Sequence, residues 1–408
     1  MNQTNTASPP SERAALFMAL FLAMGAALLL LLSWVLTIFG LVTLSGLKFN
    51  EQPGIFILAG GTFELGLLML PGIILNARKF LHKPDWHSSF PDINDRVLIP
   101  IMIFFWLCSL GFGQFVAGNH LAATLILPFI NILAIGLPIL AYIRISLRGL
   151  ALLDARRAWS IFGASLIISP LLALLFEVIT VGIIILLYVA YASSIPGLRE
   201  TFSSLLGSLQ SGGFNESETL RMTASLLFAP GASLTALGIF SGAVPLIEET
   251  FKITMIMIFI KKIPHPTNGF MLGILCGAAF ALSENIGYAS AGSTNWAANA
   301  AARATSALPH ILNSGMLGWG LVSAYREHRY SRLIASFLAA TLIHGTWNAI
   351  SVGLLMNSFS SYIAVVPYYL QSPYPLTIGW VIMALGVLIG LIFNNRQMRN
   401  SAIKNQAE

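Results

Sequence analysis

The sequence predicts an all-α protein, a polytopic transmembrane helical bundle of about ten spans. Of its 408 residues, 56% are hydrophobic and only 9% are charged, whereas a soluble domain carries about 25% charged residues. The apolar residues form long runs, each near or above the roughly 20 residues that a helix needs to cross a bilayer. Lysine and arginine gather in short clusters between these runs, which is typical of the cytoplasmic loops of membrane proteins.

The apolar runs define the candidate spans in order. The N-terminal "MNQTNTASPPSERA" has no basic start, and the run behind it is too long for a signal-peptide core, so we interpret that run as the first permanent span. Segment 223–262 is too long for one straight span and is interrupted by "APG" at 229–231 and by Pro245. It predicts a broken or re-entrant piece near 223–245, followed by a helix over 246–262. The expected spans are 14–44, 54–75, 97–117, 121–143, 160–192, 223–262, 267–290, 302–325, 333–356 and 375–394.

The basic residues predict the orientation of these spans. All the basic clusters can face the cytoplasm together if both termini are inside and segment 223–262 crosses once. We therefore expect an integral protein of a prokaryotic plasma membrane, with both termini cytoplasmic and the lipid bilayer as a partner. Because the net charge of +6 comes from these clusters, nucleic acid is not an expected partner. The clusters are Arg78, Lys79, Lys83 and Arg96; Arg144, Arg148, Arg156 and Arg157; Lys261 and Lys262; Arg326, Arg329 and Arg332; Arg396, Arg399 and Lys404.

The polar content of the spans divides the chain. Acids in the first half are isolated, namely Glu64 and Glu177, and their role is structural or unknown. The second half concentrates its polar groups. The expected regions are a polar tail over 1–13, a transmembrane region of unknown role over 14–220, a core carrying the polar motifs over 221–356, and a last span with a cytoplasmic tail over 357–408.

Four polar clusters interrupt the last spans. Each acid at mid-helix costs about 2.5–3.5 kcal/mol on insertion scales, so these groups need partners, water or a metal. The clusters are "EETFK" with Glu248, Glu249 and Lys252; "FALSENIGY" with Glu284 and Asn285; "RATSALPHILNSG" with Arg303 and His310; and "HGTWN" with His344 and Asn348.

The predicted orientation gives these clusters a common depth. Glu284 lies about six residues from the outer end of its span, roughly 9 Å at the helical rise, and His310 about eight residues, roughly 12 Å. The glutamates of "EETFK" lie in the outer half of their helix, and His344 lies near the middle of its span. The sequence therefore predicts one site that opens toward the extracytoplasmic side.

Several interpretations of these residues stay open. Glu248 and Lys252 are spaced i,i+4 and could form a structural ion pair, and the asparagines could bond neighbouring helices. A carboxylate can instead act as a general base beside histidines that stabilise an oxyanion. Glutamate and histidine also suit a divalent metal such as zinc. Acids and histidines at midplane can equally serve an ion- or proton-coupled transporter, and a non-catalytic scaffold or immunity-type protein is a third class.

The motifs EExxK, FxxxEN, R…PHILNSG and HxxxN occur in this order over about 100 residues. Together they resemble the PrsW family of intramembrane proteases, related to the prenyl (CAAX) endopeptidase and bacteriocin-processing superfamily. The resemblance covers roughly residues 220–355. It implies an intramembrane endopeptidase that hydrolyses peptide bonds of membrane-associated protein substrates in or near the bilayer; the prototype acts on an anti-sigma factor.

The resemblance implies roles for the motif residues. Glu248 or Glu249 is hypothesised as the base that activates water, and Lys252 as the partner of these acids. Glu284, His310 and His344 are hypothesised as metal ligands or oxyanion stabilisers. Metal-dependent and glutamate-only mechanisms both stay open. Supporting roles fall to Asn348, as a hydrogen-bond donor, and to Asn285 and Arg303.

Overall fold

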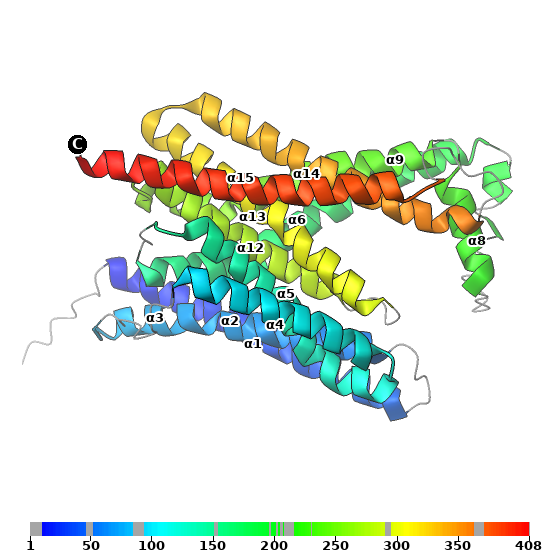
Figure 1. The fold of residues 1–408 in the computed structure, drawn as a ribbon, viewed down its shortest axis with the longest axis horizontal. Helices are drawn as coiled ribbons and strands as arrows, with labels where there is room; N and C mark the ends of the chain where they lie inside the picture. The colour runs from blue at the N-terminus through cyan, green and yellow to red at the C-terminus, as the bar shows by residue number, and fades with distance from the viewer. Residues whose placement is uncertain are drawn as a thin grey trace, which may run out of the picture.

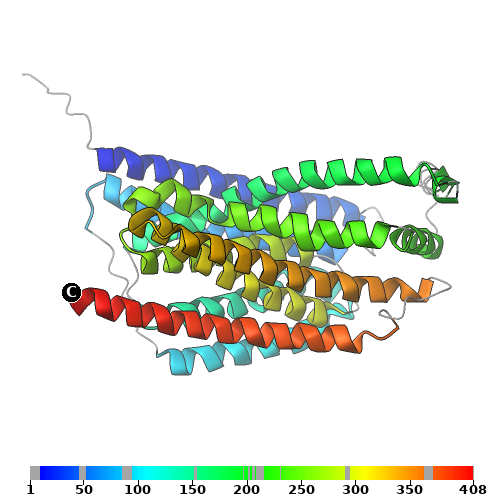
Figure 2. The same ribbon diagram turned by 90° about the horizontal axis from the view of Figure 1, so that it is seen from above.

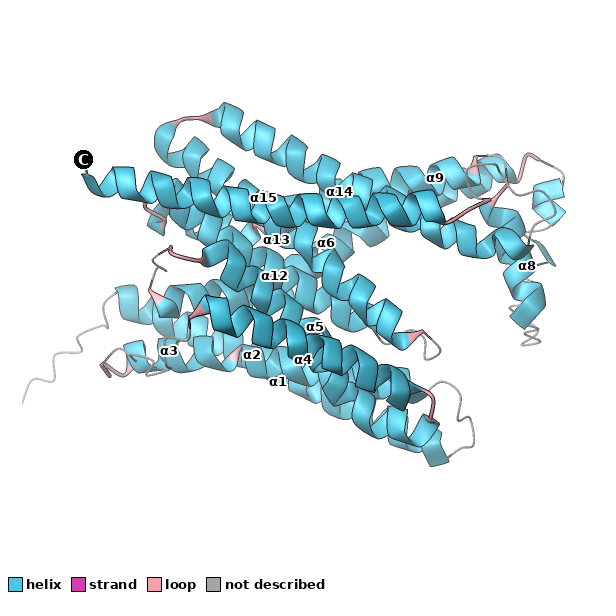
Figure 3. Cartoon of the chain, viewed as in Figure 1, coloured by secondary structure: helices cyan, strands magenta, loops and turns pink. Residues whose placement is uncertain are grey.

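The computed structural model describes residues 10–45, 52–84, 94–150, 154–195, 197–200, 203–204, 207, 216–229, 231–289, 295–362 and 371–407. Within these residues every regular element is a helix (Figure 3). The predicted all-α class is confirmed. Most of the predicted polar tail, residues 1–9, lies outside the described residues.

Six helices form the first half of the chain. Three of them begin at a polar residue whose side chain accepts a hydrogen bond from the first helical turn: Asn94 from Arg96 N, Asn119 from Ala122 N and Asp154 from Arg156 N. The six helices are α1 (Pro10–Ser45), α2 (Gln52–Leu68), α3 (Leu70–Phe80), α4 (Asp95–Ala117), α5 (His120–Leu147) and α6 (Ala155–Ala192).

The second half contains shorter and irregular helices before three long ones. The irregular part comprises α8 (Glu216–Leu227), α9 (Ala232–Gly238), a π-helical turn (Ile239–Ala243), α10 (Val244–Lys252), α11 (Thr254–Phe259) and a 3-10 turn (Ile260–Lys262). The long helices are α12 (Pro266–Ala289), α13 (Trp296–Glu327) and α14 (Tyr330–Phe359), followed by a 3-10 turn (Ser360–Tyr362) and α15 (Tyr374–Ala407).

Helix α12 lies at the centre of the bundle. It packs against α13, α6, α5 and α2, and Figure 1 shows it between α1–α3 on one side and α15 on the other. Figure 2 shows α1 (dark blue) and α15 (red) well apart in the perpendicular view too. Of the most apolar part of α12, 89% is buried, against 6% for α6. Protein therefore surrounds α12, whereas α6 exposes most of its apolar surface to lipid.

Eight of the described helices are long and apolar enough to cross a membrane, or nine counting one bent pair. The predicted count of about ten is thus approximate. The remaining predicted span, 302–325, lies in α13, which has 32 residues but is not apolar enough to be among these helices. Nearly the whole second half of α13 is buried against other helices, so it can carry polar side chains that lipid would not accept.

The predicted break in segment 223–262 is confirmed. The two arms, Leu220–Leu227 and Ala232–Lys262, are bent by 81°, and Gly231 adopts a positive φ of 80° between them, which glycine accepts without steric cost. In Figure 1, α8 accordingly points across the direction of the long helices. The π-helical turn lies directly before Pro245 in α10, and such turns are frequent at functional sites.

Small residues bring α12 and α13 into backbone contact. Gly269, Gly273 and Gly277 recur every four residues on one face of α12, and each lies against a backbone carbonyl of α13, those of Gly318, Ser314 and His310 respectively. This arrangement is the small-residue packing that lets membrane helices approach closely. The backbone of His310 is therefore held directly by α12.

Basic loop residues meet at one end of the bundle. Arg157 Nη1 donates to Lys262 O at 2.8 Å, and Arg326 Nη2 donates to Lys261 O at 2.7 Å. In Figure 1, the first described helix, α1, begins at the same end of the bundle at which the last helix, α15, ends. Several of the clusters that the sequence assigns to one side of the membrane are thus neighbours in space.

We expect Gly273→Leu to lower the melting temperature sharply in detergent, because even a Cβ at this position collides with the Ser314 carbonyl and overpacking typically costs about 1–3 kcal/mol. The control is Gly386→Leu in α15, whose Cβ would meet open space among the described residues. Thermal unfolding followed by tryptophan fluorescence measures both. Equal melting temperatures for the two variants would contradict the close α12–α13 packing.

Candidate active site

A buried ammonium group organises the "EETFK" motif on α10. Lys252 Nζ lies 2.8 Å from Glu249 Oε1 and 3.0 Å from Glu248 Oε2. Lys252 and Glu249 are fully buried, and Glu248 is 7% exposed. The spacings i,i+3 and i,i+4 place both acids on the helix face that carries the lysine. The structural ion pair considered from the sequence is therefore present, and it includes both glutamates.

Glu249 connects this motif to α14. Its Oε1 lies 2.9 Å from His344 Nδ1, and Lys252 Nζ lies 3.4 Å from the same ring nitrogen. When His344 Nδ1 carries the proton, it donates to Glu249 and leaves Nε2 with a free lone pair. That Nε2 atom lies 3.8 Å from Glu248 Oε2.

Glu284 pairs with the other histidine, His310, as Glu249 pairs with His344. Its Oε2 lies 2.9 Å from His310 Nε2 as an ion-pair contact, and a carboxylate at that distance favours a proton on Nε2 and leaves the lone pair on Nδ1. His310 Nδ1 is buried and makes no hydrogen bond to the described residues. It lies 4.0 Å from Glu248 Oε2. The two imidazole rings stand nearly perpendicular, with centroids 5.1 Å apart.

Three donor atoms therefore converge on one point. Glu248, His310 and His344 each offer one atom, and these atoms lie within 4.8 Å of one another. The other ring nitrogen of each histidine faces a carboxylate, Glu284 or Glu249. In metalloproteins, a carboxylate paired with the ring nitrogen that does not bind the metal orients the histidine in this way. The donor set can thus hold a divalent cation.

Comparison with protein families gives a match to the PrsW family intramembrane metalloprotease model over residues 219–372. Residues 219–372 are thus similar to this family, over less than half of the chain. The resemblance that the four motifs predict is confirmed over this segment, and the integral membrane character of the protein with it. Comparisons with curated proteins and with solved structures give no match.

The PrsW-family description implies a bound metal, and the donor set fits zinc in type. One carboxylate and two imidazoles are the ligands of several catalytic zinc sites, which keep a further position open for water. Ligands of a tetrahedral zinc ion stand about 3.4 Å apart, so the 3.8 and 4.0 Å separations from Glu248 would need to close by about half an ångström. The whole set spans up to 4.8 Å, so the two histidine nitrogens would need to approach each other by more than that. Glu248 and the two histidines would hold the ion.

The geometry changes the hypothesised role of Glu284. The sequence places Glu284 beside the histidines as a metal ligand, but its carboxylate pairs with the outer nitrogen of His310 and lies 3.5 Å from Arg303 Nη1. Glu248 takes the third place in the converging set instead. The spacing of motifs along the chain could not distinguish the two, because it does not reveal which oxygen faces which nitrogen.

Sequence reasoning missed Asn313, a buried residue of the PrsW-family segment. Its Nδ2 donates to Ala340 O at 3.0 Å and to Glu249 Oε1 at 3.3 Å. Asn313 thus ties α13 to α14 and fixes the carboxylate that orients His344. The sequence could have indicated Asn313, because it follows His310 by three residues and therefore lies on the same helix face.

The other supporting residues hold helices together. Ser306 Oγ donates to Asn285 Oδ1 at 3.1 Å, which joins α13 to α12. Asn348 Nδ2 donates to Phe240 O at 2.9 Å, which joins α14 to the π-helical turn before the motif glutamates. One N–H of its amide therefore bonds the backbone of that turn. Helix–helix bonding, one of the readings left open from the sequence, describes both asparagines.

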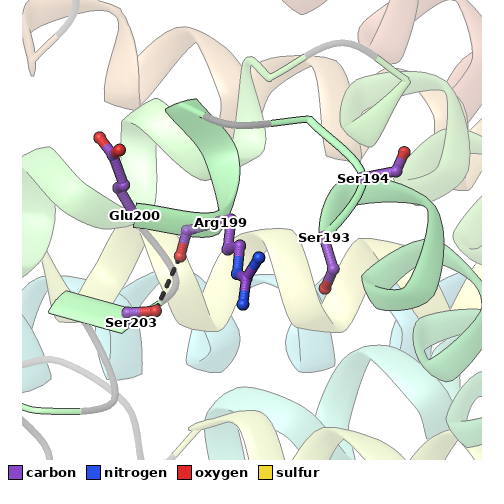
Figure 4. A pocket seen from close by; sticks show the side chains of 5 residues that line it. All are labelled: Ser193, Ser194, Arg199, Glu200 and Ser203. Atoms are coloured by element: carbon purple, nitrogen blue, oxygen red, sulfur yellow. Dashed lines mark hydrogen bonds between the residues drawn. The ribbon is translucent and has the colours of Figure 1, made fainter.

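A separate hollow lies just beyond the end of α6. It has a volume of about 540 Å³ and is lined by Ser193, Ser194, Arg199, Glu200 and Ser203 (Figure 4). Its only bond drawn in the figure runs from Ser203 Oγ to Arg199 O. The candidate site residues lie on α10, α12, α13 and α14, so this hollow is distinct from the site.

We expect purified protein to bind about one zinc ion per chain, and His310→Ala, His344→Ala and Glu248→Ala to abolish stoichiometric binding, because each removes one of three ligands. Glu284→Gln should weaken binding about 10–100-fold, as is usual for an outer-shell partner. Glu64→Gln, an intramembrane acid of α2, is the control. Elemental analysis and zinc titration measure the effects. A Glu248→Ala protein with wild-type affinity, beside a Glu284→Ala protein without any, would assign the third ligand to Glu284.

We expect Lys252→Met to destabilise the protein by about 3–5 kcal/mol, because it leaves two buried carboxylates without their counter-ion. Lys79→Met, at an exposed position of α3, should leave stability unchanged. Thermal unfolding in detergent compares the two. Combining Lys252→Met with Glu249→Gln should recover part of the loss; a Lys252→Met protein that melts like the wild type would contradict the buried ion-pair network.

Proposed function

We propose that the protein is an intramembrane endopeptidase that hydrolyses peptide bonds of membrane-associated protein substrates in or near the bilayer. The observation that carries the proposal is the convergence of Glu248, His310 and His344 inside the segment that matches the PrsW family. The substrate class follows from the position of the site on membrane helices, which a membrane-anchored polypeptide can approach.

In this proposal the metal, when bound, lowers the pKa of a water ligand and polarises the scissile carbonyl. The protein's own residues prepare the site for that chemistry. Glu284 and Glu249 hold the two imidazoles in fixed tautomers and orientations. Lys252 keeps Glu249 in place and balances the negative charge of the acids. Apart from Glu284, which is partly exposed, these contacts join buried side chains, so little reorganisation is needed when the substrate binds.

Water can approach the donor set from the side of Glu248 and Glu284, the two acids that keep some exposure. The histidines are 3% and 2% exposed and Glu249 is fully enclosed, whereas Glu248 retains 7% of its surface. Glu248 is the most exposed of the three donors, and Glu284 of the same cluster is more exposed still, with 24% of its side chain accessible. A hydrolase needs a site that is mostly dry but open to one attacking water, and this distribution of exposure suits that requirement.

We also propose that the site opens toward the extracytoplasmic side. The basic ends of α6, α11 and α13 lie together, and the positive-inside rule assigns such an end to the cytoplasm. Glu284 lies near the opposite end of α12, five residues before Ala289. A juxtamembrane segment on the outer side of the membrane would then be the region cut.

The test is proteolysis by the purified protein, reconstituted with zinc and a panel of single-span membrane peptides that carry different extracytoplasmic juxtamembrane sequences. Mass spectrometry identifies the products. We expect defined cleavage by the wild type and a loss of at least about 10³-fold in kcat for Glu249→Gln and His344→Ala, because each disrupts the oriented histidine. Glu64→Gln is the matched control, with activity retained.

Two outcomes would contradict the proposal. Retained cleavage in both Glu249→Gln and His344→Ala would place the reaction elsewhere. Absence of any peptide product, together with ion or solute flux in proteoliposomes that depends on the same acids, would favour a coupled transporter.

A further inference from the structure

Helix α6 lies outside the segment that matches the PrsW family, yet one of its faces adjoins the site. Ser165, Ser169, Ala173 and Glu177 follow one another at four-residue spacing, and the first three are buried. Ser169 Oγ donates to Lys252 O at 3.3 Å. Phe176 stacks on Phe251, with ring centroids 4.7 Å apart. This face of α6 therefore forms a wall beside α10.

Glu177 is the residue of this face of α6 that lies beside the candidate site. Its carboxyl lies close to Glu248 and in the electrostatic field of Glu284 and Lys252. Its Oε1 is buried and has no hydrogen-bond partner among the described residues. Glu177 thus lies beside the converging donor set and has an oxygen without a hydrogen-bond partner among the described residues.

A structural role explains Glu177 poorly. Its neighbours Val178 and Ile179 are 63% and 52% exposed on the lipid-facing surface, where an acid is costly. The cation that acts on it, Lys252, is already bonded to Glu248 and Glu249. Glu177 therefore has no counter-ion of its own among the described residues, and an ionisable residue of this kind inside the membrane is a candidate functional group.

Each of the other three carboxylates of the site already has a role. Glu249 orients His344, Glu284 orients His310, and Glu248 belongs to the donor set. Hydrolysis also needs a group that accepts a hydrogen bond from the attacking water and so orients it. Glu177 is the carboxylate beside the donor set that neither orients a histidine nor belongs to the set, and its Oε1, like Glu249 Oε2, has no hydrogen-bond partner among the described residues.

We propose that Glu177 is a catalytic residue of this site, whose carboxylate accepts a hydrogen bond from the water that attacks the scissile carbonyl. The proposal rests on the protease function proposed above. In the reaction the water oxygen bonds to the carbonyl carbon, the C–N bond breaks, and the leaving nitrogen takes up the proton that the water loses. The N-terminal region thereby supplies a part of the reaction centre through α6.

The first experiment compares Glu177→Gln, Glu177→Asp and the control Glu64→Gln on a peptide that the wild type cleaves. Loss of an oriented water typically costs about 10²-fold, so Glu177→Gln should lower kcat by about that factor and leave KM, zinc content and melting temperature unchanged. Glu177→Asp should retain part of the activity. Wild-type kcat for Glu177→Gln, or equal loss of zinc and of activity, would overturn the proposal.

The second experiment restores the charge chemically. In a background with Cys108→Ala and Cys276→Ala, which removes both natural cysteines, Glu177→Cys is alkylated with iodoacetate or with the neutral iodoacetamide. Recovery of kcat with iodoacetate alone supports the carboxylate role. Recovery with both reagents, with neither, or no alkylation by these water-soluble reagents would overturn it. Absence of cleavage by the wild type would overturn the proposed function instead, so the two failures are distinguishable.

Discussion

The constraint on which the site depends is the Lys252 ammonium enclosed between two carboxylates. A charge in a low-dielectric interior is tolerated only when it is paired and hydrogen-bonded, and Lys252 Nζ meets this condition through Glu248 and Glu249. The same ammonium lies 4.7 Å from the centroid of the Phe280 ring on α12. Glu249 in turn contacts His344 on α14 and accepts a hydrogen bond from Asn313 on α13. One buried ion pair thus brings four helices to a common point.

The close α12–α13 contact supplies the second half of the geometry. Gly277 lies against the His310 carbonyl, so the backbone that carries this histidine cannot shift without moving α12. Glu284 lies seven residues further along the same helix, and its carboxylate reaches His310 Nε2. The N-terminal helices pack on this pair equally closely: Gly61 of α2 faces Ile286, and Gly113 of α4 faces Trp296. Positions that exclude even a methyl group therefore frame the site.

The helical membrane fold was predictable because its signals are local. Apolar runs long enough to span a bilayer, interrupted by basic loops, indicate spans without any knowledge of their neighbours, and "APG" at 229–231 marked the bend that the structure contains. The count of spans was less secure. Helix α13 is long but polar, and only its burial among other helices explains how it lies in the bundle. Hydropathy measures contact with lipid, so it describes poorly a helix whose neighbours are protein.

The sequence by itself determined the class of protein, the motif residues and their common depth, since ionisable groups are rare and costly in membrane helices and therefore stand out. Only the tertiary structure decided which atoms meet. It put Glu248 rather than Glu284 into the donor set, turned Asn348 toward a backbone carbonyl, and added Asn313 and Glu177 to the surroundings of the site. The reason is physical: the atoms that face each other depend on the rotation and separation of packed helices, and these follow from side-chain packing across the whole bundle, which no local spacing records.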